Sequence, residues 1–400
     1  MAKTLPRLRR TLEFLPAPDH RGLIVRDPYH YSDAMIVVPP LLARCLQCFD
    51  GDQTDLDLRA ELARLTGELE VGEIEEHLIS TLSSSGFLED GAFRDMRDRR
   101  RREFAEAPLR AAAHAGSAYP GDPVELRETM ERWMDGARRP IAGLRAIAAP
   151  HVSPDGGWPC YGAAFGALGP ELVDRTFVIL ATSHFGESER FGLSRKPFAT
   201  PLGEAQTDAA LVDELAEAGG EAVEMEDYCH SFEHTVEFQV LFLQHVLGPR
   251  VRIVPVLCGP FGRSLYGGGV PEDDPGVANF LAGLRRAGER EGDRLVWVLG
   301  IDLAHMGARY GDDHQCIANE GLMREVEQRD LARLDRVLAG DAEGFWSLVR
   351  DTEDDLKWCG SAPLYSFLRA APGLRGQCLR YGQWNIDPAS VVSFAALAWT

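Results

Sequence analysis

The sequence predicts an α/β protein in which a central sheet is covered by helices on both faces, preceded by a small winged-helix-like domain. From about residue 110 onward, apolar runs of strand length alternate with amphipathic helical segments, which is the pattern of a sheet buried on both faces. Before that point the pattern is mostly helical. A chain of 400 residues is also too long for one small core, so two domains are expected.

Residues 1–92 are expected to form the small domain. Short strands are predicted at 22–27 and 34–39, helices at 40–51, 54–67 and 70–86, and a strand or hairpin at 86–93. Three helices followed by a hairpin are the order of a winged helix. Cys45 and Cys48 form a C-x-x-C inside the first helix. We interpret this pair as core packing, because no second cysteine pair lies nearby.

The stretch 93–109 is expected to be a charged linker. Its run Arg99–Arg102 is flanked by acidic residues, which favours a solvated helix over the alternative, a patch that docks a partner. In residues 110–400, strands are predicted in the segments "LRAIAAP", "TFVILATS", "VRIVPVLCG", "RLVWVLGIDLA" and "ASVVSFAALAW". Helices are predicted between several of them, for example in "DAALVDELAEAGG" and "VEFQVLFLQHVLG".

Composition excludes several classes of function. The net charge of −20 argues against nucleic acid as a partner, because phosphate binding needs a positive field. No stretch approaches the length of a transmembrane helix, so no membrane partner is expected. The N-terminus has no apolar segment of the kind found in signal peptides. We therefore expect a cytoplasmic protein in which the eight cysteines are reduced.

Polar residues that could bind a metal follow three of the predicted strands. His151 follows "AIAAP", His184 follows "FVILATS", and Asp302 follows "VWVLG", with His305 close behind. Ligands of open α/β sheets bind beyond the carboxyl ends of the strands. Two histidines and one carboxylate are a residue set that holds non-haem iron. One such histidine alone would be unremarkable, but three such strand ends in one domain favour a site.

A second candidate lies in the stretch "CHSFEHTVEFQ". His230, Glu233 and His234 spell H-x-x-E-H, the pattern of one class of zinc peptidases. The apolar stripe that follows, however, predicts a helix starting near Ser231, which would place His230 before the helix and off the face of His234. Ser231 would then cap that helix, and Glu233 would favour its N-terminus through the helix dipole.

Eight segments, taken in order, resemble the Memo family, also called AmmeMemoRadiSam system protein B. They are "AGSAYPGDP", "APHVSPDGGWPCYGAAF", "ILATSHF", "TPLGEAQTD", "EHTVEFQVLFL", "IVPVLCG", "GIDLAHMG" and "CGSAPLYSFL". The resemblance implies a fold like the LigB-type class III extradiol dioxygenases, in which a histidine pair near two strand ends binds iron. It implies that His151 and His184 are ligands of iron or copper, and that His234 and His305 act in catalysis. The family name implies radical-SAM and AMMECR-like partner proteins.

The chain departs from the family pattern in places. Some relatives carry a cysteine ligand just before the last histidine, where this chain has Ala304. The third ligand is then expected from Asp302, His305 or His234, or from water. Trp is common before "YP" in the first segment, where this chain has Ala118.

Residues 1–92 resemble the PqqD-like winged-helix domains, which recognise leader peptides in peptide-modification systems. The similarity lies in the pattern "LLARCLQCFDGDQTDLDLRAELA…LISTLSSSGFLED". Winged helices often bind DNA, but the stretch "DQTDLDLRAELARLTGELE" is acidic where a DNA-reading helix should be basic.

The sequence leaves three functions open. The first is an enzyme with one metal ion, most simply iron, that performs redox chemistry on a small-molecule or peptide substrate. The second is a binding module in which the same cleft holds a peptide or phosphotyrosine-like segment without chemistry. The third is a zinc peptidase that uses the H-x-x-E-H pattern.

Overall fold

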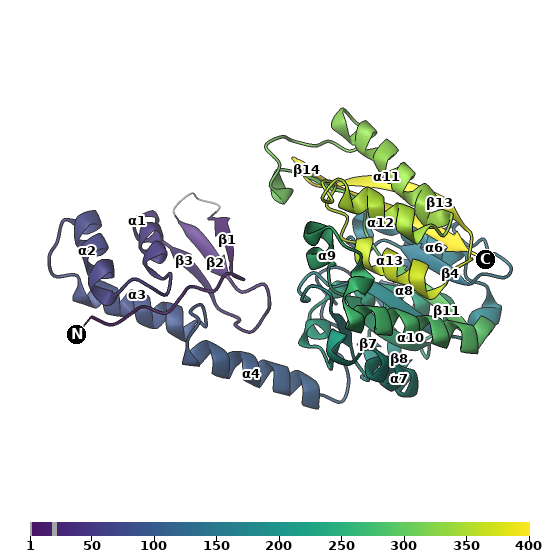
Figure 1. Cartoon of the computed structure of the whole chain (residues 1–400), viewed down its shortest axis with the longest axis horizontal. Coiled ribbons are helices and arrows are strands. Elements are labelled where there is room, and N and C mark those ends of the chain that lie inside the picture. The colour runs from purple at the N-terminus through teal and green to yellow at the C-terminus, as the bar shows by residue number, and fades with distance from the viewer. Residues whose placement is uncertain (1, 18–21) are drawn as a thin grey trace. The chain divides into compact units, whose positions relative to one another are not determined.

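The computed structural model describes residues 2–17 and 22–400 (Figure 1). The contacts within the chain divide it into two compact units, residues 1–106 and 107–400. No helix among the described residues combines the length and the apolar character needed to cross a membrane.

The first unit joins a small antiparallel sheet to a set of helices. Its strands are β1 (Glu13–Pro16), β2 (Leu23–Arg26) and β3 (Met35–Val38), in the order β1-β2-β3. Its helices are α1 (Pro40–Ala43), a 3₁₀ turn (Arg44–Cys48), α2 (Asp55–Thr66), α3 (Gly72–Ser84) and α4 (Gly91–Glu106). The predictions of β2, β3, α2 and α3 are confirmed, whereas β1 was not predicted. Cys45 and Cys48 are buried in this unit's core.

The strand or hairpin expected at 86–93 is reduced to one isolated antiparallel bridge between Leu88 and Leu8. Helix α3 ends at a left-handed Gly86, with φ of 69°, and α4 begins at Gly91. The side chain of Asp90 accepts a hydrogen bond from the backbone N–H of Phe93 at 3.0 Å, as a residue that caps a helix does. The strands of this unit therefore precede its helices, and the charged stretch after residue 92 continues α4.

The second unit is a three-layer α/β structure. Its strands are β4 (Ala146–Ala149), β5 (Thr176–Thr182), β6 (Phe191–Leu193), β7 (Phe198–Thr200), β8 (Gly203–Thr207), β9 (Val223–Met225), β10 (Arg252–Cys258), β11 (Leu295–Gly300), β12 (His305–Gly307), β13 (Gly376–Asp387) and β14 (Ser390–Trp399). Its α-helices are α5 (Pro123–Trp133), α6 (Pro154–Gly166), α7 (Ala209–Gly219), α8 (His234–Leu247), α9 (Gly262–Gly267), α10 (Pro275–Glu291), α11 (Leu322–Leu338), α12 (Ala342–Arg350) and α13 (Ser361–Ala370). All five predicted strands are confirmed, as β4, β5, β10, β11 and β14.

The central sheet is mixed. Its main path runs β12-β14-β4-β11-β5-β10-β6-β9, and β13 pairs with β14 at the margin. The four strands β4, β11, β5 and β10 are parallel to one another, whereas β14 and β6 pair antiparallel with β4 and β10. The parallel centre therefore brings the ends of four strands to one edge of the sheet.

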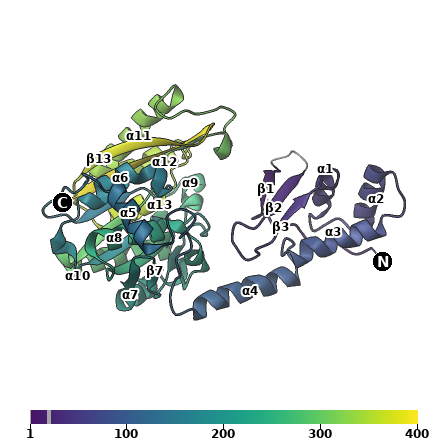
Figure 2. The same ribbon diagram turned by 180° about the vertical axis from the view of Figure 1, so that it is seen from behind.

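Helices cover both faces of this sheet, which are seen from opposite sides in Figures 1 and 2. One face packs against α7 and α10 to α13, and the other against α5, α6 and α8. Along β5, Val178 and Leu180 belong to the first core, while Phe177 and Ile179 belong to the second. This alternation explains why the central strands are apolar throughout.

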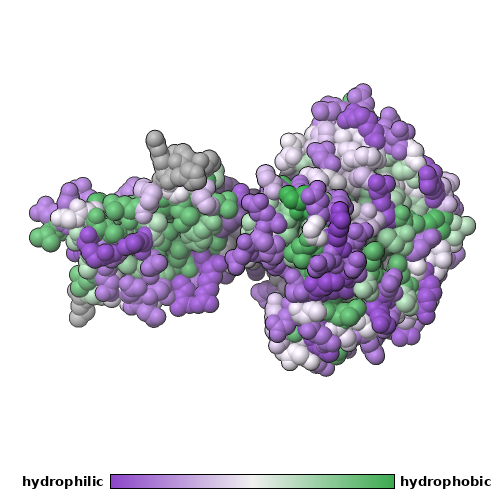
Figure 3. Space-filling model, turned by 90° about the horizontal axis from the view of Figure 1, so that it is seen from above, coloured by the Kyte–Doolittle hydropathy of each residue, from purple (hydrophilic) through white to green (hydrophobic). Residues whose placement is uncertain are grey.

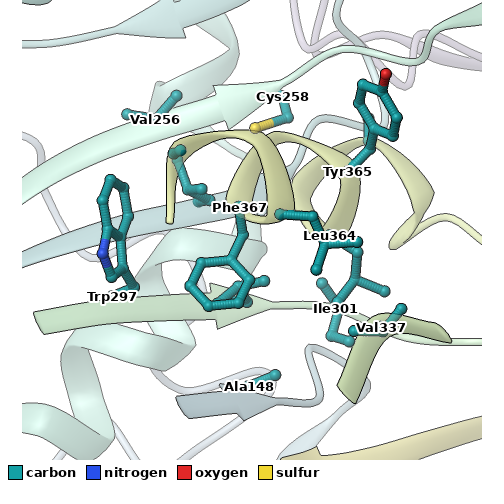
Figure 4. Close-up of a cluster of buried hydrophobic side chains, with 14 of the residues drawn as sticks. Ala148, Val256, Cys258, Trp297, Ile301, Val337, Leu364, Tyr365 and Phe367 are labelled. Atoms are coloured by element: carbon teal, nitrogen blue, oxygen red, sulfur yellow. The ribbon is translucent and has the colours of Figure 1, made fainter. Parts of the chain in front are cut away.

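Large side chains fill the core between α13 and the sheet. Trp297 of β11 and Phe367 of α13 meet edge to face, with ring centroids 6.2 Å apart, and Leu364 belongs to the same core cluster (Figure 4). All three side chains are at most 2% exposed. Helix α13 is therefore packed closely against the sheet.

Candidate metal centre

Three adjacent strands deliver polar residues to the same edge of the sheet. Strand β11 lies between β4 and β5 and is parallel to both. His151, Asp302 and His184 each follow one of these strands by two residues. Because the strands end at the same edge, the three side chains are brought together, as the sequence pattern predicted.

Helix α8 adds a further histidine at its first residue, His234. The Thr235 hydroxyl donates to the carbonyl oxygen of Thr182 at 2.7 Å, and the Gln239 amide donates to the carbonyl oxygen of Pro150 at 2.9 Å. A Cβ on Gly300 would lie 2.8 Å from the carbonyl oxygen of Thr235. Glycine at the end of β11 therefore allows the helix to approach the strand ends this closely.

The imidazoles of His151, His184 and His234 form a compact cluster. One nitrogen of each can be chosen so that all three lie within 4.8 Å of one another. The ring centroids are 5.0 Å apart for His151 and His184, 5.4 Å for His151 and His234, and 5.2 Å for His184 and His234. The His151 side chain is 2% exposed, against 31% for His184 and 29% for His234. The cluster is thus buried on one side and open on the other.

The Nδ1 atom of each imidazole already has a partner in the protein. His151 Nδ1 lies 3.1 Å from the carbonyl oxygen of Gly300, which can only accept, so this nitrogen carries the proton. The Nδ1 atoms of His184 and His234 lie 3.1 and 3.0 Å from Oε1 of Glu233. The Nε2 atom of each ring is therefore left to act as a ligand, the arrangement that protein metal sites use.

Glu233 is the carboxylate that orients two of the histidines. It caps α8 by accepting from the backbone N–H of His234 at 3.0 Å and also accepts from the N–H of His184 at 2.8 Å. Burial by itself would raise the pKa of Glu233, but the attraction of His184 and its hydrogen bonds outweigh burial and hold that pKa well below its usual range. Burial likewise opposes protonation of His184, yet Glu233 raises its pKa well above the usual value. Glu233 is therefore ionised and orients both rings.

Cys359 brings a thiol to the same cluster. Its Sγ lies 3.2 Å from Nε2 of His151. The backbone holds it there, because the Thr182 hydroxyl donates to the Cys359 carbonyl oxygen at 2.9 Å and the Gly360 N–H donates to the Asp302 carbonyl oxygen at 3.1 Å. A Cβ on Gly360 would lie 2.7 Å from that same oxygen, so this close approach requires glycine.

Sequence reasoning assigned no role to Cys359 or to the carboxylate of Glu233 as a partner of two histidines. It sought a cysteine ligand at Ala304, which is fully buried in the core. The signal that could have found Cys359 was present, because the segment "CGSAPLYSFL" is one of those that carried the family resemblance. The sequence does not show that this segment lies beside the strand ends in the folded protein.

Asp302 and His305 lie at the margin of the cluster. Asp302 accepts from the His151 N–H at 3.1 Å, and its Oδ2 lies 3.5 Å from Nε2 of His151. Burial raises the pKa of Asp302 to about 7. His305 Nδ1 is 3.0 Å from the carbonyl oxygens of both Leu303 and Lys357, and burial, followed by the charge of His184, lowers its pKa to about 4. Neither belongs to the group of three nitrogens that could share one ion.

The H-x-x-E-H pattern does not converge on one point. His230 lies in a 3₁₀ turn (Tyr228–Ser231), and its Nε2 is 3.0 Å from the carbonyl oxygen of Gly192. Helix α8 begins at His234 with Glu233 as its cap, so the predicted start near Ser231 is wrong. The Ser231 hydroxyl instead donates to the Tyr228 carbonyl oxygen at 2.7 Å. Glu233 caps the helix in place of Ser231, and the same carboxylate also contacts the rings of His184 and His234.

The fold and the cluster define an α/β protein with a candidate three-histidine metal centre at the carboxyl edge of its parallel strands. The family model described as "Memo-like protein" matches residues 110–398, so the chain belongs to the Memo family. A "MEMO1 family protein" of Aquifex aeolicus is 25% identical over 380 residues, covering 94% of this chain and 95% of the relative. A second, from Thermococcus kodakarensis, is 28% identical over 303 residues, covering 73% of this chain and 99% of the relative.

Similarity in sequence extends to an animal protein. The "Protein memo-1 homolog" of Caenorhabditis elegans is 26% identical over 273 residues, covering 66% of this chain and 72% of the relative. The crystal structure of an uncharacterized protein from Escherichia coli K12 matches with a TM-score of 0.37 and 11% identity, covering 64% of this chain and 99% of that one. Because the Aquifex match covers 94% of this chain, it extends into the first unit.

Proposed function

We propose that this Memo-family protein is an oxidoreductase related to the extradiol dioxygenases, which binds one iron or copper ion at His151, His184 and His234 and acts on a small-molecule or peptide substrate. The observation that carries the proposal is the convergence of three imidazoles whose Nδ1 atoms are all engaged by the protein. A second supporting observation is the thiol of Cys359 beside His151.

The donor set fits a transition metal. Imidazole suits iron, copper and zinc, thiolate favours copper and zinc, and hard cations such as Mg²⁺ prefer oxygen. His151, His184, His234 and Cys359 would hold the ion. A bound iron or copper ion would supply the capacity for electron transfer.

The protein's own residues would hold and orient the reactants. Glu233 fixes the rings of His184 and His234, and Gly300 fixes the ring of His151. The open side of the cluster, where His184 and His234 are about 30% exposed, is where a substrate would approach. His305 would border that substrate's position, and Asp302, which is buried beside His151, would support that ring. In this proposal His234 is a ligand, and His305 is a bordering residue.

The test is elemental analysis of protein purified without oxygen and without added metal. We expect close to one equivalent of iron or copper, lost in the double variant His151→Ala/His184→Ala and retained in His245→Ala, which removes a histidine from the far end of α8. Circular dichroism would verify that each variant is folded. Unchanged metal content in the double variant, or zinc as the only metal, would overturn the proposal.

A second function, protein or peptide recognition, is favoured by the first unit. Figure 3 shows apolar side chains gathered on its surface. Met35 and Val37 on the edge strand β3 are 65% and 58% exposed. An edge strand offers unpaired backbone groups to an extended peptide. This unit would then work as a PqqD-like module that recruits a peptide or the radical-SAM and AMMECR-like partners of such systems.

The recognition function can be tested on the isolated first unit with a displayed library of random peptides. Selected peptides should bind with an affinity that falls at least tenfold in Met35→Asp/Val37→Asp, and Leu69→Asp, which changes an equally apolar residue that is 94% exposed, should not weaken it. Equal loss in both variants would mean non-specific adhesion. The zinc peptidase gains no support, because the Nε2 atom of His230 is engaged by the carbonyl oxygen of Gly192.

A further inference from the structure

A buried carboxylate outside the metal centre is connected to it by two separate routes. Asp330 on α11 is 0% exposed. It accepts three hydrogen bonds, from Trp358 Nε1 at 2.7 Å, from the Tyr381 hydroxyl at 2.7 Å and from the Ser393 hydroxyl at 2.6 Å. Burying a carboxylate costs free energy unless it is fully hydrogen-bonded, so these three hydrogen bonds are needed to keep Asp330 in place.

All three groups around Asp330 donate a hydrogen bond to it, so its carboxylate acts only as an acceptor. The indole N–H of Trp358 can only donate. The Ser393 hydroxyl already accepts from the Ala304 N–H at 2.8 Å, and the Tyr381 hydroxyl already accepts from the Gln383 amide at 3.0 Å. Each of these hydroxyls therefore has its single proton available for Asp330. An ionised carboxylate has acceptor sites for all three donors, whereas an amide in its place would bring two protons of its own.

The first route runs through Trp358 to Cys359, the next residue in the chain. The segment before it contains Glu353, Asp354 and Lys357, whose φ angles are 50°, 48° and 55°. Residues other than glycine adopt this left-handed conformation only when surrounding contacts impose it. The bond between Asp330 and the buried indole of Trp358 holds the residue that comes directly before Cys359 in the chain.

The second route runs through Ser393 to Asp302. The Leu303 N–H donates to the Ser393 carbonyl oxygen at 2.8 Å, and the Ser393 N–H donates to the Ala304 carbonyl oxygen at 2.9 Å. Ser393 thereby fixes the backbone just after Asp302. The two routes are connected to each other, because the Gly360 N–H donates to the Asp302 carbonyl oxygen at 3.1 Å.

We propose that Asp330 is a positioning residue that sets the thiol of Cys359 and the segment of Asp302 relative to the three histidines. The inference rests on the proposed function in one respect, that Cys359 belongs to a metal site. The geometric part, that Asp330 fixes where the thiol lies, holds with or without a metal.

The experiment uses the full chain with Asp330→Asn, and with Trp358→Phe as a second variant that removes a single donor. Glu189→Gln is the control, because Glu189 is 1% exposed and bound by Arg263 and Ser264, outside both routes. The first readout needs no metal. It is the rate at which iodoacetamide alkylates Cys359, resolved by peptide mass spectrometry, with the exposed Cys378 as the internal reference.

We expect the alkylation rate of Cys359 relative to Cys378 to change at least fivefold in Asp330→Asn and in Trp358→Phe, and to stay at the wild-type value in Glu189→Gln. The second readout is titration with Co²⁺, whose thiolate charge-transfer absorption reports the sulfur directly. Binding should weaken by about 10- to 100-fold in both variants, as for other residues that orient ligands, with a loss of that absorption.

The two kinds of failure are distinguishable. If the wild-type chain binds no Co²⁺ but the alkylation rates change as expected, the proposed function fails and the positioning role stands. If the alkylation rate and the Co²⁺ affinity of Trp358→Phe equal those of the wild type, the positioning role is overturned, even if Asp330→Asn does not fold.

Discussion

The thiol sulfur of Cys359 lies 3.2 Å from Nε2 of His151, although 208 residues separate the two in the chain. His151 is held by a strand end and Cys359 by the loop before α13. The centre is therefore assembled from elements that meet only in the folded protein. Changes at either element should be visible in metal binding.

The first prediction concerns the thiol. Cys359→Ser should retain binding of Co²⁺ by the three imidazoles but abolish the thiolate charge-transfer absorption, because a hydroxyl is a poor ligand for soft transition metals. Cys378→Ser, which changes an exposed cysteine, should leave the spectrum intact. A full thiolate band in Cys359→Ser would exclude Cys359 as a ligand.

The second prediction concerns Glu233. Glu233→Gln should weaken metal affinity by about 10- to 100-fold, because the carboxylate accepts with both oxygens from His184 and His234, whereas an amide has one acceptor oxygen and an NH2 group that can only donate. Isothermal titration with the wild type and the variant measures the difference. Glu226→Gln changes a carboxylate bound to Ser194 and Lys196 instead, and it should bind metal normally. Equal affinities in all three proteins would contradict the role assigned to Glu233.

The third prediction concerns the ion pair between Arg110 and Glu237, which are 1% and 0% exposed. Arg110→Met should lower the free energy of unfolding by about 3–5 kcal/mol, since it leaves a buried carboxylate without its partner. Burial alone would raise the pKa of Glu237, but Arg110 and Tyr119 lower it below the usual value. This stabilisation is therefore present above the unfolded-state pKa and is lost as the pH falls. Urea titrations at pH 7 and pH 3 would measure both effects, and a variant as stable as the wild type at pH 7 would refute them.

The fourth prediction concerns the pH dependence contributed by His230. Burial is the largest cause and, together with the positive charge of Arg110, lowers the pKa of His230 to about 4, although the hydrogen bond to Gly192 and the charges of Glu226 and Glu233 act in the opposite direction. The unfolded chain binds the proton at a pH near 6.5, so stability should fall between about pH 6.5 and pH 4, by on the order of 3 kcal/mol. In His230→Gln the decline over this interval should be shallower by that amount. Parallel stability curves for the two proteins would show that His230 contributes nothing.

The fifth prediction concerns the two units. A chain cut near Pro108 should give two fragments that each show cooperative unfolding by circular dichroism, because each unit has its own buried core. The first fragment should not bind random duplex DNA even at low salt, where electrostatic attraction is strongest. Micromolar binding that weakens steeply with added salt would instead identify a DNA-binding unit.

Much of the central sheet could be predicted from the sequence because its strands are short apolar runs followed directly by polar residues. His151, Asp302 and His184 could be placed together for the same reason, since parallel strands share one edge. Strand β13 was missed, because its residues are polar and partly exposed at the margin of the sheet, where packing imposes no apolar pattern.

The rest of the centre depends on contacts between segments distant in sequence. Cys359 comes from a loop whose position is fixed by Thr182 and Asp302, and no local pattern encodes that return. Glu233 could be seen to favour a helix start. That it also binds His184 could be seen only once the helix was placed against β5.

The unequal exposure of the three histidines has a consequence for exchange kinetics. His151 is almost completely enclosed, whereas His184 and His234 each present nearly a third of their side chains to solvent. In the proposed metal site, an ion arriving from solution would meet His184 and His234 first and reach His151 last. A competing chelator could then reach the ion only from the side of His184 and His234, so the bond to His151 would be the last to break and would set the rate of metal loss.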